Sequence, residues 1–359
     1  MKIIGEGTYG CVVKPSLKCK EENMDYRRRV SKIMNLQDAK LELKEMEAIS
    51  KIPGYEKFAV LVPKMCSPIQ DDTFKSVLSG CAINKKVRSD KTFDLRLLLL
   101  DDAGRDLSQL PKNLYTDFNE RCIFLTSIIN LFEGLIFFRD NGIAHLDIKA
   151  DNLIYNESTR VMKFIDFGMA STLEDFKQLY TSNRISYSWS NLITGYPEET
   201  ACGKAEHFTL PRCQKKYKNF ANNYDLFMDK FVKTIDSFCL TDTLCEIFNL
   251  LKLKIKPSVS IEEARFYKDV MTLLESYYHE DLYYRNANLE NLKTRYIEIL
   301  KNANMHVIGS IREGHNNEND ADYEPRYIAD SRSGGLILRK SKRKKRQGGR
   351  KQSKKRKCL

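Results

Sequence analysis

Four residues between positions 147 and 166 have side chains suited to moving a phosphoryl group. Asp147 carries a carboxylate that can accept a proton from a hydroxyl, and Lys149 can neutralise a phosphate during its transfer. Asn152 and Asp166 supply the oxygen ligands that Mg²⁺ prefers. Because phosphoryl transfer depends on positioning and charge neutralisation, these four residues predict a metal-dependent phosphoryl-transfer site.

The surrounding stretch resembles the catalytic and metal-binding loops of the eukaryotic protein-kinase family. Residues 145–152 read His-Leu-Asp-Ile-Lys-Ala-Asp-Asn, close to the family's H-R-D-x-K-x-x-N, and 166–168 read Asp-Phe-Gly. The resemblance implies ATP as phosphate donor, Mg²⁺ (or Mn²⁺) as metal, and Asp147 as the proton acceptor. Lys149 is typical of members that act on serine and threonine. His145 is expected to have a structural role, packed against Phe167.

One position departs from the family pattern. Leu146 replaces the arginine that, in many kinases, pairs with a phosphate on the activation segment. A leucine cannot make that ion pair, so the resemblance implies activity without that phosphorylation.

A glycine-rich segment near the N-terminus could bind the phosphates. Gly5, Gly7 and Gly10 permit sharp turns and a close approach of backbone amides to phosphate oxygens. A Rossmann loop is the alternative, but a strand-like run follows Gly10 where a helix would be required. The resemblance adds Tyr9 over the terminal phosphate and, over the adenine, Ile4 and Val12.

The next predicted strand, Arg29–Met34, offers a lysine for the ATP phosphates. Lys32 shares a strand face with Val30, whereas the alternative, Lys14, lies close to the glycine segment. An insertion over residues 15–29 separates the glycines from Lys32.

Residues 35–52 show helical periodicity and end before Pro53-Gly54. The resemblance requires this helix to carry a glutamate paired with Lys32. Glu42, Glu45 and Glu47 are candidates, and the local pattern favours Glu45, with Ile49 one turn later against Phe167.

A buried strand at Leu97–Leu100 is followed by Asp101-Asp102-Ala103-Gly104, which resembles the hinge between kinase lobes. The resemblance implies that backbone groups of Asp101 and Ala103 bind the adenine, that Leu100 guards the back of the pocket, and that Ile154 forms its floor. The Ala-Gly-Arg-Asp-Leu run is similar to hinges of casein-kinase-like and virus-encoded kinases.

The large lobe should begin with a long helix at Tyr115–Asn141. Its apolar part, Cys122–Phe138, contains Glu133 and is interpreted as a buried helix instead of a membrane span. Residues 166–198, rich in Ser, Thr and Tyr, would form the activation segment, ending at Tyr-Pro-Glu. The resemblance further assigns Asp225 to bracing the catalytic loop and Arg285 to pairing with Glu198. An insertion is inferred around 200–218.

The 359-residue chain has a net charge of +12 that is concentrated at its end. Thirteen of its 60 basic residues lie between Arg339 and Lys357, and the 47 others nearly balance 48 acidic residues. This tail is interpreted as a nuclear-import signal, a sequence-blind nucleic-acid arm, or a solubilising tail. We expect an α+β fold with a small lobe at 1–100, a large lobe at 101–312, and a disordered linker and tail at 313–359.

The ten cysteines show no repeated spacing, and Cys202, His207 and Cys213 lack a fourth partner for a zinc site. Free thiols and a cytoplasmic or nuclear location are therefore expected, and the N-terminus leaves no room for a signal peptide. The start, hinge, Tyr-Pro-Glu variant and basic tail together look like a kinase of a large DNA virus, which implies a host-cell or virion location. An aminoglycoside-type kinase and an ATP-binding scaffold without activity are the alternatives.

Overall fold

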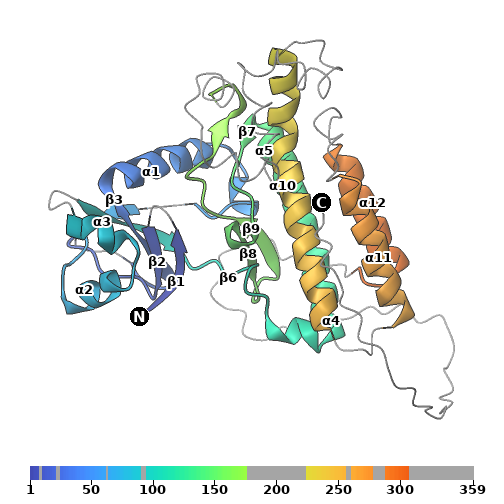
Figure 1. Ribbon diagram of the computed structural model, residues 1–359, viewed down its shortest axis with the longest axis horizontal. Coiled ribbons are helices and arrows are strands. Elements are labelled where there is room, and N and C mark those ends of the chain that lie inside the picture. Colours follow the sequence, from blue (N-terminus) through green and yellow to red (C-terminus); the bar gives the residue numbers. More distant parts are fainter. Residues whose placement is uncertain are drawn as a thin grey trace.

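The computed structural model describes residues 1–7, 10–21, 25–61, 64–89, 94–175, 224–255, 260–277 and 288–306. Within them, a five-stranded antiparallel sheet with short helices lies beside a mainly helical part (Figure 1). The predicted α+β class with two lobes is confirmed.

The small lobe consists of β1 (Lys2–Gly7), β2 (Gly10–Lys14), β3 (Arg29–Asn35), α1 (Leu36–Ser50), η1 (Tyr55–Lys57), β4 (Lys64–Cys66), α2 (Asp72–Ser79), α3 (Ile83–Ser89) and β5 (Leu95–Asp101). The large lobe consists of β6 (Arg105–Asp106), η2 (Lys112–Tyr115), α4 (Phe118–Ser127), α5 (Ile129–Asp140), β7 (Ile143–Ala144), η3 (Ala150–Asn152), β8 (Leu153–Asn156), β9 (Val161–Phe164), β10 (Ser171–Thr172), α10 (Tyr224–Lys254), α11 (Ile261–Glu275) and α12 (Leu289–Asn302).

The strands of the small lobe are ordered β1-β2-β3-β5-β4, and their register separates two faces. Val12 lies opposite Lys32, and Lys32 opposite Leu98, so these three side chains share one face. The adjacent residues, including Ile33 and Leu97, point to the other face and form a buried cluster with side chains from α2 and α3. We call these the Lys32 face and the outer face.

Four cysteines of the outer face form two disulfides, Cys11–Cys81 and Cys19–Cys66. For these four, the prediction of free thiols is wrong. The reason lies in tertiary structure: each bond joins a strand to a segment far away in the chain, with Cα atoms 6.0 and 5.8 Å apart. Glu21 lies beside the second pair, but sulfurs bonded to each other are not thiolates and do not offer a metal site.

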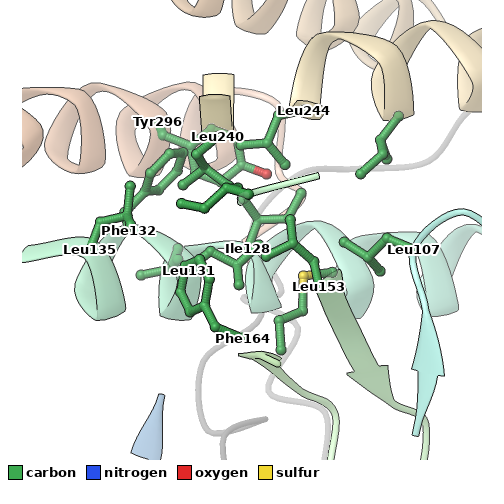
Figure 2. Close-up of a cluster of buried hydrophobic side chains, with 14 of the residues drawn as sticks. Leu107, Ile128, Leu131, Phe132, Leu135, Leu153, Phe164, Leu240, Leu244 and Tyr296 are labelled. Atoms are coloured by element: carbon green, nitrogen blue, oxygen red, sulfur yellow. The ribbon is translucent and has the colours of Figure 1, made fainter. Parts of the chain in front are cut away.

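The helices α4 and α5 form the centre of the large lobe. The run Phe118–Asp140 is long and apolar enough to cross a membrane, yet 83% of its most apolar window is buried inside the protein. Figure 2 shows Leu131, Phe132 and Leu135 of α5 packed below Leu240, Leu244 and Tyr296 of α10 and α12. The predicted buried helix is therefore confirmed.

A buried ion pair joins α4 to α11. Arg121 Nε and Nη2 donate to the two carboxylate oxygens of Glu263 at 2.8 and 3.1 Å, and Nη1 donates to the carbonyl of Leu114. The two side chains are only 7% and 3% exposed. Because both charges are removed from water, each depends on the other for compensation.

Candidate active site

The loop between β7 and β8 places two polar side chains against one carboxylate. Asp147 Oδ2 accepts hydrogen bonds from Lys149 Nζ and from Asn152 Nδ2, each at 2.8 Å. Asn152 Nδ2 also donates to the backbone carbonyl of Asp147 at 2.8 Å, which closes the loop on itself. Asp147 remains 19% exposed and Lys149 47% exposed, so both can contact a bound molecule.

The start of this loop is held by Asp236, a residue that was not predicted from the sequence. Asp236, on α10, accepts hydrogen bonds from the backbone N–H groups of His145 at 2.6 Å and Leu146 at 2.9 Å. Burial raises the pKa of this carboxyl. The assignment of this role to Asp225 is wrong, because residue 225 lies in the first turn of α10, about three helical turns from Asp236. The contact joins residues 91 positions apart in the sequence, so no local pattern marks Asp236 as the residue that holds this loop.

Leu146 adopts an unusual backbone conformation for a branched residue. Its φ is +67°, its side chain is 2% exposed, and it belongs to the main core cluster of the large lobe. The bonds to Asp236 and the burial of the leucine compensate for this conformation. The loop is therefore anchored at this position by apolar packing.

His145 is fully buried and has the structural role that was predicted. Its ring lies 4.5 Å from the ring of Phe167, measured between centroids. The backbone N–H of Asp147 donates to Nδ1, so Nε2 carries the proton and donates to the carbonyl of Ile165 at 3.0 Å. The imidazole thus connects this loop to Ile165, which links the end of β9 to Asp166.

Lys32 connects the small lobe to the Asp-Phe-Gly segment. Its Nζ contacts both oxygens of Glu42 at 2.9 and 2.8 Å, and Asp166 Oδ1 at 2.9 Å. Burial opposes the charged form of Lys32, but the charges of Asp166 and Glu42 outweigh it and raise its pKa. Burial also works against the Asp166 carboxylate, and the adjacent Lys32 charge more than offsets it, so the pKa of Asp166 is lowered.

The prediction that Glu45 pairs with Lys32 is wrong. Glu42 makes this ion pair instead. The buried side of α1 consists of Ala39, Glu42, Met46 and Ile49, spaced as one helical stripe. Glu45 lies beside this stripe and is half-buried, whereas Glu42 is 4% exposed and shares the stripe that faces the core. The stripe itself was the sequence signal that distinguishes the two. Ile49 and Phe167 belong to one core cluster, as expected.

Apolar residues from both lobes lie where the hinge was predicted. Val30 is opposite Leu100 in the sheet, two pairs beyond Lys32 and Leu98 and therefore on the same face. Val30 and Ile154 are buried, yet among the described residues they lie outside the three core clusters. Surfaces that are shielded from water without joining a core suit the walls of a flat apolar ligand site.

The connection between the lobes is short and fixed by ion pairs. Asp101 pairs with Arg29 at 2.6 Å, and Asp102 pairs with Lys14 at 2.6 Å. Ala103 is half-buried, and Gly104 follows with a φ of +130°. A side chain at 104 would collide with the carbonyl of Tyr155, so this turn requires glycine.

The glycine segment is a β-hairpin whose strands β1 and β2 are described. Gly5 lies opposite Val12, and Gly7 opposite Gly10. A Cβ at Gly10 would collide with the carbonyl oxygen of Ile33, so this glycine is required for close packing against β3 as well. Ile4 and Val12 are both half-buried. Tyr9 lies outside the described residues.

Asn152 and Asp166 have the chemistry expected of magnesium ligands. The Asn152 amide nitrogen is used by Asp147, which leaves its carbonyl oxygen as the group able to hold a cation. Asp166 uses Oδ1 for Lys32, and its side chain is partly exposed. Carboxylate and carbonyl oxygens are hard ligands of the kind that Mg²⁺ and Mn²⁺ accept, so these residues fit the implied metal.

Several predicted features lie outside the described residues. They are most of the activation segment, the Tyr-Pro-Glu motif with Glu198, the insertion at 200–218 with Cys202, His207 and Cys213, Arg285, and the basic tail.

Comparisons with known proteins address the identity of this site. Residues 104–191 match the protein kinase domain. Cyclin-dependent kinase-like 2 of Homo sapiens is 28% identical over 180 residues, which are 50% of this chain and 31% of that protein. Mitogen-activated protein kinase 4 of Oryza sativa subsp. japonica is 24% identical over 172 residues, 48% of this chain and 40% of that protein. Cyclin-dependent kinase 12 of Caenorhabditis elegans is 26% identical over 191 residues, 52% of this chain and 23% of that protein.

These similarities are with protein kinases, and the small lobe with its antiparallel sheet and the helical large lobe are consistent with a two-lobed kinase fold. The chain spans about a third of the length of the cyclin-dependent kinase-like relatives it matches. The family match begins at Gly104, so it covers the catalytic loop and the Asp-Phe-Gly segment and leaves out Lys32 and the glycine segment.

Proposed function

We propose that this protein is an ATP- and Mg²⁺-dependent kinase that phosphorylates serine or threonine in proteins. The observation that carries the proposal is the joint placement of two charge groups: Lys32 between Glu42 and Asp166, and Lys149 with Asn152 around Asp147. The first group suits the phosphates of a nucleotide, and the second suits an acceptor hydroxyl.

In this proposal the residues divide the reaction among them. Lys32, held by Glu42, binds the inner phosphates of ATP. Asp147 orients the acceptor hydroxyl and takes its proton, and Lys149, 2.8 Å from that carboxylate, neutralises the transferred phosphate. Asp166 and Asn152 would hold Mg²⁺, which supplies positive charge to the phosphate oxygens. The lysine at 149 supports a preference for serine and threonine.

The decisive experiment compares the intact protein with Asp147→Asn in a radiolabelled-ATP assay on a mixture of proteins. Replacing a general base lowers the rate roughly 100- to 10,000-fold, so labelling should nearly vanish. ATP binding should remain, because Asp147 is separate from the group around Lys32. Equal labelling by both proteins would rule out Asp147 as the proton acceptor.

The labelling assay, combined with a thermal-shift measurement, separates the kinase from an ATP-binding scaffold. A scaffold would gain thermal stability from ATP with Mg²⁺, but neither the intact protein nor Asp147→Asn would label any protein. The described residues retain Lys32, Asp147 and Asp166, whose side chains are all engaged in the site, and this favours the active enzyme.

The buried Leu146 supports activity without activation-segment phosphorylation. Because the side chain is apolar and packed in the core, it offers no cation to a phosphate. Enzyme treated with phosphatase, with its 170–195 segment verified as unmodified by mass spectrometry, should keep its rate within about twofold, since no charge pair is lost. Inactivity until that segment is phosphorylated would contradict this.

The proposal also includes binding partners for the basic tail, a location and an origin for the protein. Thirteen basic residues between Arg339 and Lys357 support contact with nucleic acid or an import receptor, and hence a place in the cytoplasm, nucleus or virion. Together with the Ala-Gly-Arg-Asp-Leu hinge, they favour a kinase of a large DNA virus. Deletion of residues 339–357 should abolish DNA binding at low salt, and unchanged binding would remove the nucleic-acid interpretation.

A further inference from the structure

The outer face of the small-lobe sheet carries both disulfides, one at β2 next to the edge strand β1 and the other at the opposite edge strand β4. Cys11 lies opposite Ile33, Ile33 opposite Leu97, and Leu97 opposite Cys66, so Cys11 and Cys66 occupy one row across four strands. Each residue of this row is adjacent in the chain to a residue of the Lys32 face. A bond at Cys11 is thus one residue away from Val12, which lies opposite Lys32.

The Cys11–Cys81 bond joins strand β2 of the glycine hairpin to the connection between α2 and α3, residues Gly80–Ala82. The bond spans 70 residues of sequence. The covalent bond restrains the two segments relative to each other in the folded protein, and the long loop it closes also constrains the unfolded chain.

The Gly80–Ala82 connection touches the other strand of the same hairpin as well. The backbone N–H of Ala82 donates to the Glu6 carboxylate on β1. At Gly80 an added Cβ would lie 3.1 Å from Ile3 Cδ1, so glycine allows the connection to approach β1 closely. One short segment therefore contacts β1 twice and is covalently bonded to β2.

The Cys19–Cys66 bond serves a different part of the lobe. It joins the inserted segment after β2 to β4, which is the sheet edge opposite β1. Backbone hydrogen bonds from Lys20 to Ser67 and from Ile69 to Lys18 accompany it. This second disulfide is remote from the glycine hairpin and provides a matched control within the same face.

We propose that the Cys11–Cys81 disulfide holds the β1–β2 hairpin in place over the nucleotide, so that loss of this bond weakens ATP binding. The inference rests on the proposed function, because it assumes that the hairpin covers ATP. Fixing a loop in its bound conformation before the ligand arrives removes part of the ordering cost of binding.

The bond forms by a balanced thiol–disulfide exchange. Two protein thiols give up two electrons and two protons to a disulfide oxidant such as oxidised glutathione, which becomes two free thiols while one S–S bond forms in the protein. Cys11 and Cys81 are 1% and 3% exposed, so reagents reach the bond only when the Gly80–Ala82 connection opens. The bond therefore forms during folding and exchanges slowly afterwards.

The test uses the full chain prepared in oxidised-glutathione buffer, with its disulfides mapped by alkylation and mass spectrometry. Calorimetry then gives the Kd of ATP with Mg²⁺ for three proteins: unaltered, Cys11→Ala/Cys81→Ala, and Cys19→Ala/Cys66→Ala. The first pair of substitutions should raise Kd roughly two- to tenfold, the equivalent of ordering one loop side chain. The second pair should leave Kd unchanged.

A second arm does not depend on the variants. The unaltered protein, reduced under mild denaturation and refolded in thiol buffer, should show the same weaker binding, and reoxidation should restore it. Equal Kd values for the first variant and the unaltered protein, or free thiols at Cys11 and Cys81 after oxidised preparation, would overturn the inference while leaving the kinase proposal intact. No ATP binding by the unaltered protein would overturn the proposed function, and the inference with it.

Discussion

The two lobes bring charged residues to one site, but different interactions stabilise their interiors. In the large lobe, α4, α5, α10 and α12 pack through apolar and aromatic side chains, and the buried pair Arg121–Glu263 joins α4 to α11. In the small lobe, a single five-stranded sheet has a smaller buried cluster on its outer face, and two disulfides cross-link it to its covering segments.

The difference follows from the size of each core. A large helical core buries enough apolar surface to hold itself together, whereas a single sheet with short helices buries little and gains more from cross-links. In the proposed reaction the small lobe positions fewer groups than the large lobe, mainly Lys32 and the β1–β2 hairpin. Residues 104–191, which match the protein kinase domain, include Asp147 and Asn152, whose hydrogen bonds close their own loop.

The largest effect is expected from breaking the buried pair of the large lobe. Arg121→Met leaves the Glu263 carboxylate buried without its partner, which costs about 3–5 kcal/mol of unfolding free energy. Urea unfolding measures the loss. The control is Arg265→Met, which removes an exposed pair with Asp269 on α11 and should cost about 0.5 kcal/mol or less.

A double variant sharpens this test. Arg121→Met combined with Glu263→Leu removes both buried charges, and stability should return to within about 1 kcal/mol of the unaltered protein. A double variant as unstable as Arg121→Met alone would show that packing around α4, and not the uncompensated charge, explains the loss.

The second prediction concerns the contact between the lobes. Glu42→Gln removes the charge that holds Lys32, and should lower kcat/KM for ATP by roughly 10- to 100-fold, the worth of a charge-assisted hydrogen bond. Glu45→Gln, one turn along the same helix, should change it less than about twofold because Glu45 has no part in the Lys32 group. Steady-state kinetics at varied ATP distinguishes them. The larger loss in Glu45→Gln would restore the original assignment.

What the sequence reveals depends on how local the determining contacts are. Asp147, Lys149 and Asn152 lie within six residues and bond to one another, so their motif carries its own geometry. The buried helix followed in the same way, from periodicity along one stretch, whereas the structural role of His145 followed from the resemblance. Lys32 was identified through strand alternation, although its partner Asp166 is 134 residues away.

The misses have two causes. The resemblance favoured Glu45, although the helical spacing of Ala39, Met46 and Ile49 places Glu42 on the buried face of α1. Asp236 meets the catalytic loop across a sequence distance of 91 residues, and the disulfides close distances of 70 and 47. The irregular spacing of the cysteines gives no indication of which ones pair, because the pairing depends on how distant segments fold onto the sheet.

The smallest expected effect is at an exposed pair between α5 and α12. Arg139 contacts Glu290 at 2.6 Å, and this hydrogen bond lowers the pKa of Glu290. Because the folded pKa lies below the unfolded value, the contribution of this ion pair to stability is complete above about pH 4.3 and disappears as pH falls through the folded pKa.

Both side chains contact water and Arg139 also pairs with Asp140, so Glu290→Gln should cost only about 0.3 kcal/mol at pH 7. Denaturant midpoints should show that difference shrink as pH falls below about 4.3, and Glu298→Gln on the same helix should show none at pH 7 or in acid. A difference that persists in acid would mean that Glu290 acts through packing, which would place this contact closer to the buried pair of the large lobe than to a surface ion pair.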